Sequence, residues 1–182
     1  MICSGFYYSP ICIFAAMQTS IVKARPQDIV IIQSLIQLIW KPTYQHILSD
    51  AQMDYMLDMM YSSEILESQF ENGHQFLLLY SGEAPVGFAG FEFNYETNGV
   101  CKLHKIYLLP ETQGKKMGRQ LFSEIKTIAA AAGQQKLLLN VNRYNKAANF
   151  YKKLGMEIAA EVDVEIGNGY FMNDYIMALD LS

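Results

Sequence analysis

The first half of the chain alternates short apolar runs with amphipathic stretches, a pattern that predicts strands and helices. Residues 19–24 are predicted to form a strand, and Pro26 then opens a helix. Ser49 followed three residues later by Gln52 predicts the capped start of a second helix. The core-facing positions are Ile29, Ile32, Ile36 and Ile39 in the first helix and Met53, Met56, Leu57 and Met60 in the second.

The second half predicts strands that alternate with helices. Two strands, 76–80 and 86–95, are joined by the turn Ser81-Gly82-Glu83, and a third strand, 101–109, ends at Pro110. The remaining predicted elements are a helix from Met117 to Ala132, a strand at 136–141, a helix at 146–154 and a closing hairpin of strands 157–166 and 170–181. Antiparallel strands followed by a strand-helix-strand run predict an α+β fold with one mixed sheet covered by helices.

Composition narrows the classes of function. A chain of 182 residues that is 51% hydrophobic and 18% charged is typical of one globular domain. A net charge of -4 argues against nucleic-acid binding. The three cysteines and three histidines have no metal-site or disulfide-framework spacing, so we expect no metal and a cytoplasmic protein.

The first sixteen residues are apolar but lack the basic start of a signal peptide, and Pro10 interrupts a run too short to span a bilayer. We therefore expect no membrane association. Met17 opens a segment that resembles a natural start, so residues 1–16 are predicted to be a disordered tail or a mis-assigned start, and 17–182 a single domain.

One loop, within LLPETQGKKMGRQL at residues 108–121, concentrates candidate chemistry. Gly114 and Gly118 flank a helix start whose first N–H groups lack intrahelical partners, and Lys115, Lys116 and Arg119 add positive charge. A pyrophosphate-sized anion site fits this pattern, and so does a basic turn that only caps a helix. The glycine spacing matches neither familiar nucleotide-binding loop.

The loop resembles the [QR]xxGx[GA] signature of the GCN5-related N-acetyltransferase (GNAT) superfamily, with Lys116 where the inner glycine is usual. The segment NKAANFYKKLGM is similar to a second motif of that family, through Asn145, Ala147, Phe150, Tyr151 and Gly155. The layout from about Ile21 onward resembles the PaiA-type spermine/spermidine acetyltransferases.

The resemblance implies a mostly antiparallel central sheet and direct acetyl transfer from acetyl-CoA to a primary amine, without a metal. Tyr151 matches the tyrosine that protonates the coenzyme thiolate, although it could instead be a packed helix residue. His104 occupies the place of the usual glutamate base, and by strand alternation it would share a face with Ile106 and Leu108. A lone strand histidine is more often a packing or hydrogen-bonding residue.

The same resemblance predicts where the coenzyme binds. The loop amides would hold its pyrophosphate, and the backbone of Ile106, Tyr107 and Leu108 would pair with its pantetheine arm. The predicted loop contacts are Gln113, Gly114, Lys115, Lys116, Met117, Gly118 and Arg119. Asn140 and Asn145 are predicted as further coenzyme contacts.

For the acceptor amine, Asp50, Asp54 and Asp58 form an acidic stripe that would suit a polycation, although such a stripe is more often a solvated helix face. Asp174 is an alternative amine anchor. The leading hypothesis is a small-molecule amine acetyltransferase, with a polyamine as candidate acceptor and a homodimer as a possible assembly. A peptide acetyltransferase and a non-catalytic CoA-binding module remain alternatives. In the family that the chain resembles, members that acetylate peptides often carry an acidic residue where Asn140 and Asn142 stand here, and this departure weighs against a protein N-terminal acetyltransferase.

Overall fold

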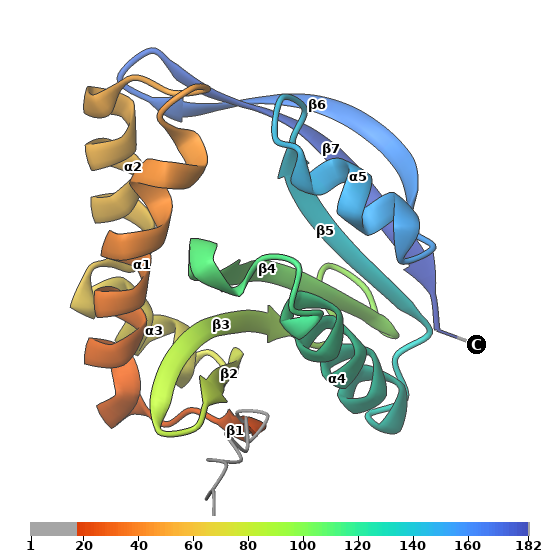
Figure 1. Ribbon diagram of the computed structural model, residues 1–182. Helices are drawn as coiled ribbons and strands as arrows, with labels where there is room; N and C mark the ends of the chain where they lie inside the picture. The colour runs from red at the N-terminus through yellow and green to blue at the C-terminus, as the bar shows by residue number, and fades with distance from the viewer. Residues whose placement is uncertain (1–17, 182) are drawn as a thin grey trace, which may run out of the picture.

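The computed structural model describes residues 18–181, which form one seven-stranded sheet with helices on both faces (Figure 1). The strand order is β1-β2-β3-β4-β5-β7-β6, and every neighbouring pair is antiparallel except β4 with β5. The strands are β1 Thr19–Lys23, β2 Gln75–Ser81, β3 Ala84–Glu92, β4 Val100–Leu108, β5 Lys136–Asn142, β6 Glu157–Gly167 and β7 Tyr170–Asp180. The predicted α+β class with a mostly antiparallel sheet is confirmed. The predicted tail at 1–16 lies outside the described residues.

Five α-helices and two 3₁₀ turns connect these strands. They are η1 Pro26–Asp28, α1 Ile29–Tyr44, α2 Asp50–Tyr61, α3 Ser63–Glu71, η2 Pro110–Thr112, α4 Met117–Ala131 and α5 Ala147–Lys153. The sequence did not predict α3. Ser62 creates it, because its extended backbone (ψ 156°) interrupts the helical run and its hydroxyl accepts a hydrogen bond from the Ile65 amide.

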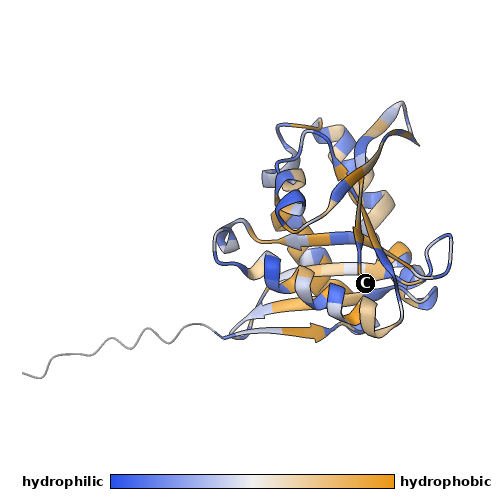
Figure 2. Ribbon diagram, turned by 90° about the vertical axis from the view of Figure 1, so that its right-hand side faces the viewer, coloured by the Kyte–Doolittle hydropathy of each residue, from blue (hydrophilic) through white to orange (hydrophobic). Residues whose placement is uncertain are grey.

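Two hydrophobic cores lie on opposite faces of the sheet. Helices α4 and α5 pack on one face, around buried residues such as Leu121, Ile125 and Leu139. Helices α1, α2 and α3 pack on the other face, around Trp40, Ile36 and Phe88. Figure 2 shows hydrophobic residues running through the central strands between the helical layers. No helix in residues 18–181 is long and apolar enough to cross a membrane.

Strands β4 and β5 pair over only part of their length. The parallel register runs from Val100 opposite Lys136 to Leu103 opposite Leu139. Beyond that point β4 stays paired with β3, while β5 stays paired with β7. The two strands therefore diverge in the middle of the sheet (Figure 1).

A long hairpin of β6 and β7 reaches from the sheet to α2 (Figure 1). Tyr55 of α2 donates a hydrogen bond to the Ile166 carbonyl (2.6 Å), and its ring lies 5.6 Å from that of Tyr170. A Cβ at Gly167 would lie only 2.6 Å from the Tyr55 hydroxyl, and this position also has a φ of +95°. Glycine is thus needed where the hairpin meets α2.

Candidate active site

The divergence of β4 and β5 leaves one edge of β4 without a strand partner beyond Leu103, within the described residues. Ile106 and Leu108 pack toward the core under α4 and α5, whereas Tyr107 packs toward the core under α1 to α3. The backbone of this segment therefore lies along the unpaired edge where β4 and β5 diverge, which is called the opening below. An extended ligand with amide groups could add to the edge as a strand does.

The loop before α4 begins directly after this edge. Gly114 and Lys116 both adopt positive φ angles, 76° and 63°, and Lys116 is left-handed at the helix start. A left-handed backbone disfavours residues with a Cβ, which explains why glycine is usual at the Lys116 position in the family that the motif resembles.

The start of α4 presents free donors. The Gln120 amide makes the first backbone hydrogen bond of the helix, to Lys116, so the amides of Met117, Gly118 and Arg119 have no intrahelical acceptor. The side chains of Lys115, Lys116 and Arg119 are exposed, and Met117 is buried. Free amides, the positive helix end and three cations together form a site suited to a pyrophosphate.

Gly118 connects this loop to the rest of the site. A Cβ here would lie 3.4 Å from the Phe150 ring and 3.8 Å from Leu108. The first turn of α4 thus packs closely against both α5 and the end of β4. The predicted anion loop, the free strand edge and α5 are neighbours in the fold.

Tyr151 lies in α5 and is 7% exposed. Its ring packs 6.2 Å from Phe122 of α4 and 5.4 Å from Phe150. Burial, and secondarily the Tyr44 hydroxyl, raise the pKa of Tyr151 above its usual range. The phenol therefore stays protonated at neutral pH and is available as a proton donor.

Tyr44, at the end of α1, is a site residue that the sequence did not predict. Its hydroxyl lies 3.1 Å from that of Tyr107 on β4. Burial raises the pKa of both phenols well above the usual range. No spacing rule could have indicated Tyr44, because it meets Tyr107 only through the packing of α1 on the sheet.

His104 differs from its predicted orientation. Gly90 pairs with Lys105 whereas Phe91 pairs with Leu103, so His104 is the extra residue of a β-bulge in β4. The expectation that it shares a face with Ile106 and Leu108 is wrong, because the bulge interrupts the alternation. Its Nε2 instead lies 2.7 Å from Oε1 of Glu92 on β3.

The surroundings of His104 hold its ring neutral. Burial lowers the pKa of His104 to about 4, against the opposing effect of its hydrogen bond to Glu92. Burial also lowers the pKa of the neighbouring Lys105 to about 8. The Lys105 ammonium donates to Gln69 and lies over the Tyr61 ring.

Asn140 of β5 links two buried charges across the sheet. Its oxygen accepts a hydrogen bond from Lys102 Nζ on β4 (2.5 Å), and its nitrogen donates to Asp174 on β7 (3.3 Å). Asp174 is 6% exposed, and burial raises its pKa. Burial likewise lowers the pKa of Lys102. Both ends of the Asn140 amide are thus occupied within the protein, although the sequence predicted it as a coenzyme contact.

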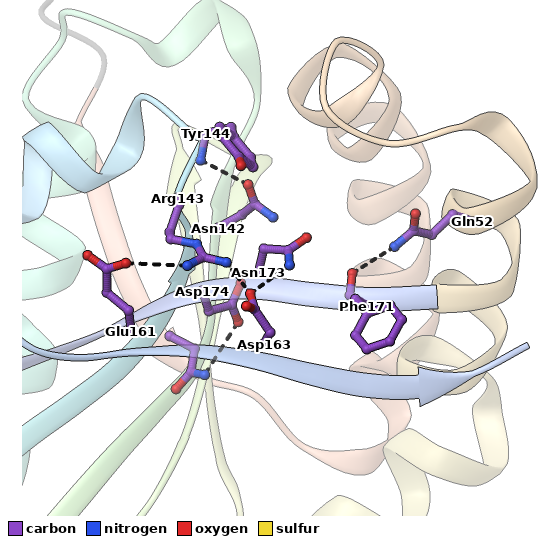
Figure 3. A network of polar contacts seen from close by, with 10 residues as sticks. Gln52, Asn142, Arg143, Tyr144, Glu161, Asp163, Phe171, Asn173 and Asp174 are labelled. Carbon is purple, nitrogen blue, oxygen red and sulfur yellow. Dashed lines mark hydrogen bonds and ion pairs between the residues drawn. The ribbon is translucent and has the colours of Figure 1, made fainter. Parts of the chain in front are cut away.

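The polar residues beyond β5 hold the base of the hairpin (Figure 3). Arg143 forms ion pairs with Glu161 and Asp163 of β6. At the far end, Gln52 of α2 donates to the Phe171 carbonyl on β7 (3.0 Å). The hairpin that carries Asp174 is therefore fixed at both ends.

Asn145 follows β5 and precedes α5. Its side-chain oxygen accepts a hydrogen bond from the Ala147 amide (2.9 Å), which fixes the start of the helix that carries Tyr151. A side-chain hydrogen bond with Asn145 opposes the burial that raises the pKa of Tyr44, so Asn145 also links the start of α5 to the end of α1.

The acidic stripe of α2 lies apart from Asp174. Asp54 and Asp58 line a groove between α1 and α2 together with Gln33 and Gln37. Neither Asp174 nor Asn140 lines this groove. Asp50 is exposed and lies 4.0 Å from Lys41. The predicted acidic residues thus belong to two places, and Asp174 is the one beside Asn140 and the diverging strands.

Comparison with known proteins supports the sequence motifs. A profile described as the acetyltransferase (GNAT) family matches residues 32–156. A spermidine N(1)-acetyltransferase from Thermoplasma acidophilum is 28% identical over 148 residues, which cover 78% of this chain and 90% of that protein.

Solved structures of N-acetyltransferases also match the chain over most of its length. The PaiA N-acetyltransferase from Thermoplasma acidophilum, solved in complex with coenzyme A, matches with a TM-score of 0.76 and 25% identity over 90% of this chain and 99% of that chain. The ribosomal-protein-S18-alanine N-acetyltransferase from Escherichia coli shares the fold, with a TM-score of 0.69 and 20% identity over 91% of this chain and 95% of that chain.

Proposed function

Since the chain belongs to the acetyltransferase (GNAT) family and uses acetyl-CoA as co-substrate, we propose that it transfers the acetyl group to a primary amine of a small polycation of the spermidine type. The observation that supports a cationic acceptor is the buried carboxylate of Asp174, which lies beside the diverging strands. The name of the spermidine-acetylating relative supports the same choice.

The residues fit acetyl-CoA as the donor. The free edge of β4 suits a strand-like arm with amide groups, and the free amides of α4 suit a pyrophosphate. Asn145, at the start of α5, is the proposed further contact of the coenzyme. Acetyl-CoA supplies the activated thioester.

We propose direct attack by the amine in a ternary complex. An alkylammonium has a pKa near 10, so it must lose a proton before it can attack. His104 is the proposed acceptor of that proton: its Nε2 is bound to Glu92, which leaves Nδ1 for the substrate or an intervening water. Tyr151 then donates its phenolic proton to the departing thiolate. Asp174 binds an ammonium group of the acceptor.

An assay of thiol release from acetyl-CoA tests this proposal. The acceptor panel contains spermidine, spermine, single amino acids, aminoglycosides and short peptides. We expect release with the polyamines. Release with peptides alone would point to a peptide acetyltransferase, and no release with any amine would favour a non-catalytic CoA-binding module.

A further inference from the structure

Two histidines and one glutamate meet on the sheet face that is covered by α1 to α3. His74 precedes β2, Glu92 ends β3, and His104 is the bulge residue of β4. His74 Nε2 lies 3.3 Å from one carboxylate oxygen of Glu92, and His104 Nε2 lies 2.7 Å from the other. The three ligand atoms all lie within 4.8 Å of one another.

The strand register brings this cluster together. Gln75 pairs with Phe91, which places His74 beside Glu92 at the ends of adjacent strands. The bulge turns His104 toward the same carboxylate. The two imidazole rings stack with centroids 5.0 Å apart and an angle of 23° between their planes. One residue just before β2, one in β3 and one in β4 therefore converge on one point.

The chemistry of the cluster matches a transition-metal site. Two imidazole nitrogens and one carboxylate oxygen are a common set of protein ligands for zinc, with a fourth position left to water. The side chains of His74, Glu92 and His104 are 15%, 24% and 26% exposed, so an ion and a water can reach them. Tetrahedral zinc ligands lie about 3.3 Å apart, so the two imidazole–carboxylate contacts are close to ligand spacing, and the stacked rings would turn on binding to aim both Nε2 atoms at one ion.

We propose that His74, Glu92 and His104 bind a divalent transition-metal ion of the zinc class, and that this ion inhibits acetyl transfer. On binding, each ring carries its hydrogen on Nδ1 and presents the Nε2 lone pair to the ion. The ion would also withdraw the Glu92 carboxylate from its hydrogen bond with His104. The inhibition, unlike the binding, rests on the proposed function, in which His104 accepts the proton of the amine.

Titration of the full-length chain with zinc chloride by calorimetry tests the binding. Cys3 and Cys12 are replaced by serine in every variant, so that these two thiols do not compete for the ion. We expect one zinc ion per chain, and about tenfold or greater loss of affinity in His74→Ala. His46→Ala is the matched control, because His46 is exposed and outside the cluster, and it should bind as the parent protein does.

Two outcomes would overturn the site: absence of zinc binding at micromolar free ion, or equal affinity in the parent and His74→Ala. A second variant, His74→Gln, keeps the size of the side chain, and circular dichroism checks that both variants are folded. Cobalt chloride gives an independent readout, since visible absorption of a four-coordinate cobalt site should be present in the parent and absent in His74→Ala.

The inhibition is measured separately. Each rate with zinc is compared with the zinc-free rate of the same protein: zinc should slow acetyl transfer by the parent and by His46→Ala by the same factor, whereas His74→Ala should lose this zinc-dependent slowing whatever its own zinc-free rate. Zinc binding without slowing would overturn the inhibition and leave the site in place. If no amine is acetylated at all, the proposed function fails, and the calorimetry still decides the metal site.

Discussion

Asn140 donates a hydrogen bond to Asp174 across the β5–β7 pair while the same amide accepts one from the buried Lys102. The Asn140 amide thereby gives a hydrogen-bond partner both to the buried Lys102 cation and to the buried Asp174 anion, which need no direct contact with each other. An unsatisfied buried polar group costs about 1–3 kcal/mol, more if it is charged.

Replacement of Asn140 by leucine should therefore lower the free energy of unfolding by at least about 1–3 kcal/mol, because both charged partners lose the amide. Urea denaturation measures the change. Asn149→Leu is the control, since Asn149 is exposed on α5, and it should change stability by less than about 0.5 kcal/mol. Equal losses of unfolding free energy in Asn140→Leu and Asn149→Leu would show that the two hydrogen bonds of Asn140 make no specific contribution to stability.

The left-handed backbone at Lys116 gives a second prediction. Lys116→Gly removes the strain of a positive φ but adds flexibility to the unfolded chain, so we expect stability to rise by less than about 1 kcal/mol or to stay unchanged. Lys115→Gly is the matched control, because Lys115 has no positive φ and the substitution should destabilise. Thermal unfolding compares the two variants, which lose the same charge. A larger loss in Lys116→Gly would contradict the assigned backbone conformation.

Tyr151→Phe tests the proposed proton donor. Loss of a general acid typically costs about 10² to 10⁴ in rate, so kcat should fall by at least about a hundredfold. The KM for acetyl-CoA should stay near that of the parent, because the hydroxyl acts on the leaving thiolate. Tyr144→Phe is the control, since Tyr144 is 72% exposed, and it should retain full activity. An unchanged kcat in Tyr151→Phe would remove this residue from the mechanism.

Asp174 predicts a pH dependence of stability. Burial raises its pKa in the folded protein, so the charged form is disfavoured there. Below the unfolded pKa of about 3.9 the carboxyl is neutral in both states, so its burial costs no stability. As the pH rises above this value and through the folded pKa, the unfolded chain ionises more readily than the folded protein, and this stability is lost. Asp174→Asn should therefore gain stability relative to the parent at neutral pH, and the difference should shrink as the pH falls toward about 4. Denaturant unfolding at several pH values measures it, and a constant difference would contradict the burial effect.

Much of the fold follows from the sequence because most elements have strong local signals. Ser49 caps α2 as predicted, since its hydroxyl accepts from the Gln52 amide (3.2 Å). The α4 helix begins at Met117, as the apolar spacing predicts. Helix α3 was missed because Ser62 interrupts a run that otherwise continues α2 without glycine or proline. A serine inside a helical pattern is too common to predict a break by itself.

The site was less predictable because its partners are far apart in the chain. The loop residues and Tyr151 belong to local motifs, and the structure brings their elements together through Gly118, Phe150 and Leu108. The family resemblance indicates His104 as a candidate base, but strand alternation assigns it to the wrong face, because His104 is itself the extra residue of a bulge in β4. No local pattern indicates such a bulge. The strand register alone brings Glu92 to His104 and Lys102 to Asn140, so no local pattern indicates these contacts either.

The most direct test is mass spectrometry of the products formed from acetyl-CoA and spermidine. We expect the parent protein to produce acetylspermidine, Tyr151→Phe to produce it far more slowly, and Asp174→Asn to require much higher spermidine for the same rate. Absence of acetylspermidine with the parent, or equal rates with all three proteins, would contradict polyamine acetylation at the opening between β4 and β5.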